Sequence, residues 1–218
     1  MDAVACLIEI STQTRNMTSA RNRKHKAILD AATRIFIERG YNGASMDAIA
    51  EAAPVSKPTL YSHFENKHDL FAAVIDKQCE ALLDELTSAH TETGDFVSSL
   101  STIARSFVDL IYSVEALAIY RLIVAEQQQF PTLGELVYLS GPKPVLDRLS
   151  AFLKELDERG PLSISDPDSS ARLFVGMLQG DEHLRCLLGL QSGLSEAKKT
   201  GLMDAAVTLF IRGHRHEK

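Results

Sequence analysis

The side chains best suited to bind another molecule lie between Ser45 and Lys67. Within this stretch, residues 57–63 carry one ammonium group, one imidazole, two hydroxyls from Ser and Thr, one phenol and no carboxylate. All of these groups can hydrogen-bond phosphate oxygens or the edges of nucleic-acid bases. A helix face that contacts DNA is the functional interpretation. An ordinary helical hairpin with a polar surface is the alternative that the pattern alone leaves open.

The spacing of apolar residues predicts two short helices separated by a tight turn. Apolar residues recur at three- and four-residue steps over residues 46–53, which is the spacing of one helix face. Pro54 must end this helix, because proline lacks an N–H and disfavours helical geometry in the preceding residue. Ser45 and Ser56 are the two N-cap candidates, and Leu60 marks the buried side of the second helix. Two helices in this order can place the second one in the major groove of DNA.

These residues resemble the DNA-binding domain of the tetracycline-repressor (TetR) family. The resemblance spans about residues 24–75 and includes a preceding helix over residues 27–36. Its most specific parts are the runs 45–50 and 55–64, followed by Lys67 and Leu70-Phe71. The resemblance implies an all-α fold with an N-terminal three-helix helix-turn-helix domain. It also implies a C-terminal helical bundle for ligand binding and dimerisation.

One departure from the family concerns the turn between the two short helices. The family usually has glycine there, where this chain has Pro54. Glycine can adopt a positive φ angle and proline cannot, so we expect this turn to be built differently. The departure also makes a rival function conceivable, a helical-bundle small-molecule binding protein that has lost DNA binding.

Ten side chains are expected to contact DNA, and they fall into three groups. The groups are Lys57, Thr59, Tyr61, Ser62 and His63 on the reading helix, Ser45, Met46 and Lys67 at the flanking backbone, and Arg23 and Lys24 in a basic arm. In the resembled family, the lysine that matches Lys67 meets a phosphate. The alternative for the arm is a solvated tail.

The distribution of charge agrees with a protein that touches phosphate at one end. The chain has a net charge of −6, yet residues 15–67 hold nine Lys/Arg against five Asp/Glu. Residues 68–218 hold 14 against 22, so the acidic surplus lies in the remainder of the chain. No apolar run approaches the roughly 18 residues that a membrane span needs, and no membrane partner is expected. The three separated cysteines favour a reducing interior, so the expected compartment is the cytoplasm.

Three segments are expected along the chain. Residues 1–22 are interpreted as a flexible leader, with Met17 as a possible true start. Residues 23–68 form the helix-turn-helix domain, and residues 69–218 form the helical effector-binding and dimerisation domain. A helix from about Lys67 to His90 joins the last two segments. From Thr93 onward only helical patterns are present.

The last two predicted helices are rich in leucine and small residues. The resemblance implies that these helices form a four-helix dimer interface, and the patterning agrees with a self-complementary contact between two copies. The alternative is that the same residues complete the core of one subunit. The interface candidates are Leu173, Met177, Gly180, Leu184, Leu188, Leu202, Ala206, Leu209 and Phe210.

Aromatic residues on facing helix stripes predict an apolar cavity in the C-terminal domain. In the resembled family, such a cavity binds the effector that controls DNA affinity. The candidates are Phe107, Tyr120, Phe130, Tyr138, Phe152, Phe174 and Met177. Plain core packing is the alternative for each of them. The sequence does not identify the effector, although it favours a largely apolar or aromatic compound.

No motif supports catalysis or a cofactor. A Ser/His/Asp order, a Gly-rich phosphate loop and paired carboxylates are all missing from the sequence, so an all-α enzyme has no positive support. His183 and Cys186 share a helix face at metal-binding spacing, but a charged surface patch is the expected explanation. The sequence therefore predicts a sequence-specific DNA-binding transcriptional regulator, and we expect it to act as a repressor. Its expected partners are a palindromic double-stranded DNA operator, a small-molecule effector and a second copy of itself.

Overall fold

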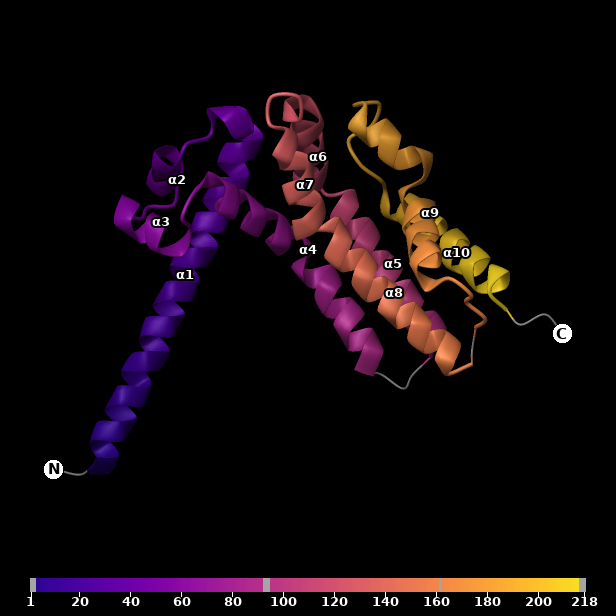
Figure 1. The fold of residues 1–218 in the computed structure, drawn as a ribbon, viewed down its shortest axis with the longest axis horizontal. Helices are drawn as coiled ribbons and strands as arrows, with labels where there is room; N and C mark the ends of the chain where they lie inside the picture. The colour runs from indigo at the N-terminus through magenta and orange to yellow at the C-terminus, as the bar shows by residue number, and fades with distance from the viewer. Residues whose placement is uncertain (1–2, 92–94, 161, 216–218) are drawn as a thin grey trace. The chain divides into compact units, whose positions relative to one another are not determined.

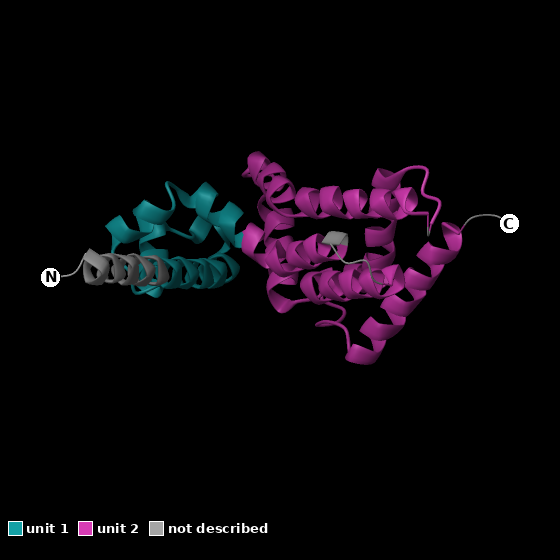
Figure 2. Cartoon of the chain, turned by 90° about the horizontal axis from the view of Figure 1, so that it is seen from below, with its two compact units in different colours: residues 1–74 teal, residues 75–218 magenta. Residues whose placement is uncertain are grey.

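The computed structural model describes the backbone of residues 3–91, 95–160 and 162–215. It describes side chains within these ranges from Ala20 onward, except those of His90 and Thr91. All regular structure in this part of the chain is α-helical (Figure 1). The predicted all-α fold class is therefore confirmed. The chain divides into two compact units, residues 1–74 and 75–218, which Figure 2 colours separately.

Unit 1 contains three complete helices and the beginning of a fourth. These are α1 (Ala3–Gly43), α2 (Met46–Ala52), α3 (Lys57–His63) and the first turns of α4 (Lys67–Thr91). The unit closes around fully buried side chains from all four helices, namely Ile28, Phe36, Ile49, Leu60 and Phe71. The rings of Phe36 and Phe71 meet edge to face with centroids 4.8 Å apart, a favourable geometry for an aromatic pair.

Helix α1 is longer than the sequence predicted. It begins at Ala3, so most of the segment expected as a leader, residues 1–22, is helical in this structure. The segment contains neither proline nor glycine, and nothing in it forces a helix to stop. At the other end, Gly40 interrupts the helix with a φ of 72°, at the position where the sequence predicted the stop.

Unit 2 holds the rest of α4 and six further helices. They are α5 (Phe96–Ile111), α6 (Val114–Glu126), α7 (Pro131–Ser140), α8 (Pro142–Glu158), α9 (Pro167–Leu187) and α10 (Glu196–Gly213). Local signals explain most of these starts. Four of these helices begin with an N-cap residue whose side-chain oxygen accepts a backbone N–H of the first turn. The four N-cap residues are Asp95, Ser113, Asp166 and Ser195. Prolines occupy the first turns of α7, α8 and α9, where their missing N–H does no harm.

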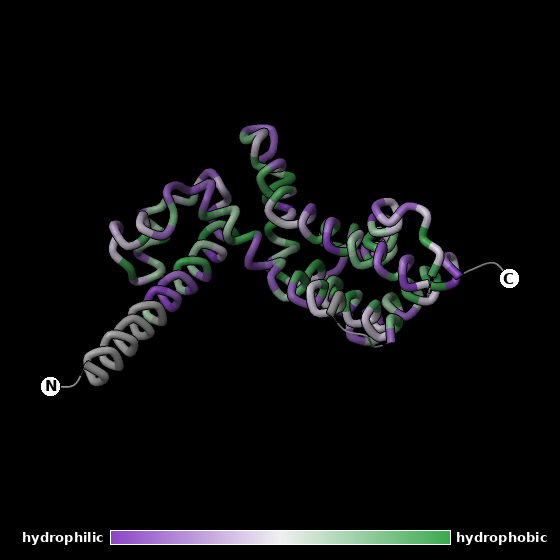
Figure 3. The backbone as a smooth tube through the Cα atoms, turned by 60° about the horizontal axis from the view of Figure 1, so that its bottom comes forward, coloured by the Kyte–Doolittle hydropathy of each residue, from purple (hydrophilic) through white to green (hydrophobic). Residues whose placement is uncertain are grey.

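The core of unit 2 forms where α5, α8, α9 and α10 meet. Helix α5 buries one face, including Leu100, Ile103 and Phe107, and turns polar residues outward. Figure 3 shows the same change between hydrophobic and hydrophilic residues along the helices of this unit. Burial of these side chains removes apolar surface from water, which is the main source of stability for such a bundle.

The corner between α7 and α8 depends on a buried glycine. The sequence predicted a break over residues 141–144, and Gly141 separates the two helices. A Cβ atom at Gly141 would lie 2.9 Å from the Ile75 side chain and 3.2 Å from the Cys79 sulfur. The corner can therefore approach α4 only because this residue lacks a side chain. Within the described part of the chain, no helix is both long and apolar enough to cross a membrane.

Candidate functional site

The turn between α2 and α3 has one of the two hydrogen bonds of a Schellman motif. The Val55 N–H donates to the Ala50 carbonyl at 3.1 Å. Pro54, which lies between the helix C-cap Ala53 and Val55, has a φ of 24°. We expected a different turn because proline does not favour positive φ. The positive φ of Pro54 contradicts the premise of that expectation, although the turn does differ in one respect, because Pro54 has no N–H for the second hydrogen bond of the motif. The conformation lies far from the usual proline φ near −65° and is strained.

Both short helices begin with the predicted serine caps. The Ser45 Oγ accepts the Ala48 N–H at 3.2 Å, and the Ser56 Oγ accepts the Thr59 N–H at 3.3 Å. These bonds satisfy N–H groups that a helix leaves unpaired at its start. The caps therefore fix where α3 begins and which of its side chains face outward.

Helix α3 presents an exposed ridge that carries no carboxylate. Lys57, Tyr61 and Ser62 are exposed, with 50% of the Tyr61 surface accessible, whereas Leu60 is fully buried. Thr59 is half-buried, and its hydroxyl lies 2.8 Å from the Ser56 hydroxyl. The Ser62 hydroxyl donates to the Thr59 carbonyl at 2.7 Å. The hydroxyl groups are thus oriented by local bonds, and Lys57 and Tyr61 extend furthest into solvent.

Lys57 forms an ion pair with an acidic residue of α2. Its Nζ lies 2.7 Å from Asp47 Oδ2, and both side chains are about 60% exposed. The hydrogen bond to Asp47 raises the pKa of Lys57, so the ammonium stays charged. Exposed pairs of this kind contribute little to stability. Lys57 can therefore exchange the carboxylate for another anion at small cost.

His63 closes the ridge against α1. Its Nδ1 lies 3.4 Å from the Nδ1 of His25, and the His25 ring stacks on Phe64 with centroids 5.1 Å apart. Burial lowers the pKa of His63, and the nearby positive side chains of Arg21 and Lys24 lower it further together with His25. At neutral pH the imidazole is accordingly uncharged. The predicted arm residues Arg23 and Lys24 are exposed on α1.

Lys67 is held inside unit 1. Its Nζ donates to the carbonyls of Tyr41 at 2.7 Å and Ala44 at 3.0 Å, and it lies 4.4 Å from the centre of the Tyr41 ring. The side chain fastens the end of α1 and the residue that follows it, Ala44, to the start of α4. The predicted phosphate contact therefore has to coexist with this structural role. Of the other two predicted backbone contacts, Ser45 is exposed and Met46 is half-buried.

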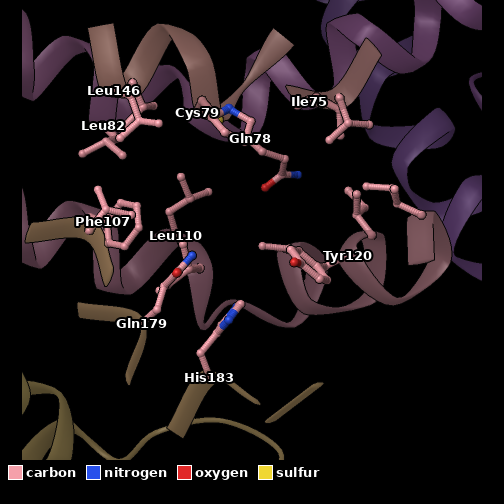
Figure 4. Close-up of a pocket in the computed structure, with 18 residues that line it drawn as sticks. Ile75, Gln78, Cys79, Leu82, Phe107, Leu110, Tyr120, Leu146, Gln179 and His183 are labelled. Carbon is pink, nitrogen blue, oxygen red and sulfur yellow. The ribbon is translucent and has the colours of Figure 1, made fainter. Parts of the chain in front are cut away.

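Unit 2 contains a cavity of about 190 Å³ that is lined by residues of α4, α5, α6, α7, α8 and α9 (Figure 4). Four polar side chains face it: Gln78 reaches in from α4, Tyr120 from α6, and Gln179 and His183 from α9. The Cys79 thiol also lines the cavity, and burial raises its pKa to about 11. The remaining lining is apolar: Ile75, Leu82, Phe107, Leu110, Ile111, Ala116, Ile119, Ile123, Val137, Pro142, Val145, Leu146 and Val175.

A kink in α9 brings its two polar residues to the cavity. Gly180 has φ 53° and ψ −166°, a conformation that only glycine adopts readily. The Tyr112 hydroxyl donates to the Gln179 carbonyl at 2.5 Å, beside the kink. Burial raises the pKa of Tyr112 to about 12, so this hydroxyl remains a donor. The rings of Tyr112 and Tyr120 both meet the His183 ring edge on.

Two of the seven predicted effector residues, Phe107 and Tyr120, line this cavity. Phe152 and Phe174 instead fill the packed core, because they lie on the faces of α8 and α9 that meet each other. Tyr138 is 49% exposed on α7. The two others are partly buried outside the cavity, Phe130 at the start of α7 and Met177 against the core cluster.

The sequence analysis missed the polar lining residues. Gln78 and Gln179 were overlooked because only aromatic residues and one methionine were considered, and His183 was considered only as a metal ligand. The available signal was a polar residue beside the apolar residues of a helix stripe, such as Gln78 next to Cys79 and three residues after Ile75. In the structure His183 is buried at the cavity, whereas the Cys186 sulfur accepts a hydrogen bond from Gln191 at 3.4 Å. No cluster of three or more metal-ligating residues occurs among the described side chains.

The predicted interface residues separate into outward and inward sets. Leu173 and Leu184 of α9, Leu188 at its C-cap and Leu209 of α10 are each more than half exposed. Gly180 is exposed as well, and Met177 and Leu202 are partly buried. Ala206 and Phe210 lie inside the subunit core, because α10 turns that face toward α5 and α9. Those two predicted contacts are therefore corrected to core residues.

Comparisons with known proteins agree with both units. Residues 28–74 match the model for bacterial regulatory proteins of the tetR family. Residues 98–215 match the C-terminal domain of AefR-like transcriptional repressors. A TetR-family regulator from Mesorhizobium loti is 30% identical with a TM-score of 0.76, over 90% of this chain and 98% of that one.

Two further proteins are similar to this chain. The Flavonoid-responsive Regulator FrrA is 32% identical with a TM-score of 0.68, over 90% of this chain and all of that one. The transcriptional activator FasR of Mycolicibacterium smegmatis is 37% identical over 91 residues, so the matching part spans only 42% of that protein.

A helix-turn-helix unit followed by a helical bundle with an internal cavity defines a DNA-binding transcriptional regulator rather than an enzyme. The chain belongs to the TetR family. The family assignment made from Ser45–Ala50 and Val55–Phe64 is confirmed.

Proposed function

We propose that two copies of this protein bind a palindromic operator and that an effector in the unit 2 cavity controls their affinity for DNA. Repression is the proposed direction, since the C-terminal match is to repressors. The observation that carries the proposal is the α3 ridge, where Lys57, Tyr61 and Ser62 are exposed and no carboxylate intervenes. Such a protein would work in the cytoplasm, beside the DNA that it regulates.

The contacts with DNA follow from the geometry of unit 1. Tyr61 and Ser62 extend toward base edges, while Lys57 exchanges Asp47 for a phosphate. His63, neutral and set against α1, contributes a hydrogen bond rather than a charge. Lys67 acts mainly by holding the segment before α2 in place.

Dimerisation is supported by the outward leucines of the last two helices. Leu184 lies in the last turn of α9, Leu188 is the C-cap of that helix, and Leu209 is exposed on α10. Exposed apolar side chains grouped in this way favour association. Helix-turn-helix dimers bind half-sites about 34–36 Å apart, so a second copy supplies the second reading helix.

Control by the effector is supported by the continuity of α4. This helix carries Lys67 at its start and Gln78 and Cys79 at the cavity. A ligand shifts the equilibrium between two states only if it binds them with different affinity. We propose that the effector favours a position of α4 that is incompatible with simultaneous binding of both half-sites.

The test is fluorescence anisotropy with the DNA upstream of the gene and with a scrambled duplex, over a series of salt concentrations. Lys57→Ala should weaken binding and reduce the salt slope by about 0.9, because one phosphate contact is lost. Asp47→Asn should strengthen binding, because it removes the competing carboxylate. Lys154→Ala, an exposed lysine of unit 2, serves as the control.

Equal affinity and equal salt slope for Lys57→Ala and the native protein would refute the role of Lys57. Genome-wide footprinting addresses the rival function. If the purified protein protects no site in the genome, it is a helical-bundle ligand-binding protein that has lost DNA binding.

A further inference from the structure

We infer that the effector is an uncharged, mostly apolar molecule of about two fused rings that carries a hydroxyl group. In the bound state, this hydroxyl donates to the imidazole of His183 and accepts from a glutamine. The inference rests on the proposed function, because it names the ligand class of the cavity that this function requires.

The absence of charge in the cavity lining determines the charge of the ligand. None of the eighteen described residues around the cavity is Asp, Glu, Lys or Arg. Three charged residues that adjoin lining residues in the sequence are engaged elsewhere or exposed. Glu182 binds Lys198 at 3.0 Å, Arg121 donates to the Leu187 carbonyl at 3.0 Å, and Asp76 is exposed on α4. A buried carboxylate or ammonium of the ligand would have no partner of opposite charge, which is costly.

The volume of the cavity determines the size of the ligand. An apolar protein cavity of about 150 Å³ holds a single benzene ring. The present cavity, at about 190 Å³, is somewhat larger, so a fused pair of rings matches it better than a long acyl chain or a nucleotide. Tyr120 is 48% exposed and also lines the cavity, so it marks the side on which a ligand enters.

The polar side chains determine where the hydroxyl lies. The imidazole of His183 is hydrogen-bonded to the backbone of Ile111, and burial lowers its pKa. The neutral ring therefore donates to the Ile111 carbonyl and keeps its second nitrogen as an acceptor. Figure 4 shows Gln179 beside His183 and Gln78 across from them. A hydroxyl both donates and accepts, so it can satisfy the histidine and a glutamine amide together.

Four compounds with the same ring system test this inference: naphthalene, 2-naphthol, 2-naphthoate and 2-naphthylmethylammonium. Equilibrium dialysis against the full-length protein measures each dissociation constant. The chain contains no Trp, so naphthol fluorescence offers a second readout. We expect 2-naphthol to bind at least tenfold tighter than both charged compounds and several-fold tighter than naphthalene.

Variants locate the hydroxyl. His183→Phe keeps an aromatic ring and removes the acceptor, so 2-naphthol should lose its advantage over naphthalene while naphthalene still binds. Gln179→Leu should also reduce the ratio of the affinity for 2-naphthol to the affinity for naphthalene. This variant tests the position of the hydroxyl if His183→Phe does not fold. Tyr138→Phe removes a hydroxyl outside the cavity and should change nothing.

Two results would overturn the inference: a charged compound that binds as tightly as 2-naphthol, or no binding of any of the four up to its solubility. An unchanged naphthol-to-naphthalene ratio in both variants would overturn the role of His183 and Gln179. Anisotropy with operator DNA separates this outcome from failure of the proposed function. Intact DNA binding with no naphthol binding rejects only the ligand class, whereas naphthol binding without any change in DNA affinity rejects effector control.

Discussion

The φ angle of Pro54 is the most strained backbone feature described in unit 1. A proline with a φ of 24° destabilises the folded state by about 1–3 kcal/mol. Because proline has no N–H, the turn also lacks its second hydrogen bond. Pro54→Gly should therefore raise the free energy of unfolding by about 1 kcal/mol or more, after allowance for the greater entropy of the unfolded glycine chain. Thermal and urea unfolding measure the change.

Pro58→Gly is the matched control for this prediction. Pro58 lies in the first turn of α3, where proline is well placed, so its replacement should lower stability. If Pro54→Gly also lowers stability, the turn in solution is not left-handed at this residue.

His183 makes the stability of unit 2 depend on pH. Burial lowers its pKa in the folded state, whereas in the unfolded chain it takes up a proton near about pH 6.5. The unfolded state thus binds more protons as the pH falls below this value, and folding is penalised. The melting temperature should decline between about pH 7.5 and about pH 5.5.

His183→Phe should reduce this decline, and His63→Gln should reduce it as well, because burial also lowers the pKa of His63. Differential scanning fluorimetry at matched ionic strength provides the comparison. An identical decline in the native protein and in both variants would show that neither imidazole is responsible.

At the scale of elements, the kink in α9 depends on one glycine. Gly180→Ala should lower the free energy of unfolding by about 1–3 kcal/mol, because alanine is strained at a φ of 53°. Gly176 lies in the same helix, and a Cβ atom added there would meet no other atom within 4 Å. Gly176→Ala should therefore stabilise the protein by about 0.5–1 kcal/mol. Chemical denaturation distinguishes the two. Equal effects would mean that α9 is not kinked at Gly180.

Helix boundaries were predictable where a local signal sets them. Ser45, Ser56 and Gly141 act through their own backbone or side-chain chemistry, and the predicted boundaries at these residues match the structure. The start of α1 was not predictable from such signals, because residues 3–22 contain no helix stop. Pro54 shows the opposite case, in which the surrounding fold imposes a conformation that the residue itself disfavours.

The identity of the cavity residues was less predictable than the fold. Phe107 and Phe174 both look like core positions in sequence, yet only Phe107 lines the cavity of about 190 Å³. Which side of a helix meets a cavity depends on how several helices pack, and that information is not local. The same reason explains Phe210, whose apolar character suited an interface although α10 turns it inward.

For the whole molecule, the outward leucines predict a dimer. Leu184→Glu and Leu188→Glu place charges on a surface that association would bury, so each should shift the protein toward monomer in sedimentation experiments. Val124→Glu, at a residue of α6 that is 59% exposed, should leave the dimer intact. A native protein that sediments as a monomer at micromolar concentration would contradict the prediction.

The state of Cys79 limits what the protein can sense. A pKa of about 11 keeps this sulfur protonated at neutral pH, and a protonated thiol is a poor nucleophile. Cys79 is therefore poorly suited to react with electrophiles or peroxides that enter the cavity. A compound that does not modify Cys79 acts only while it is bound, so such a signal ends when the compound leaves.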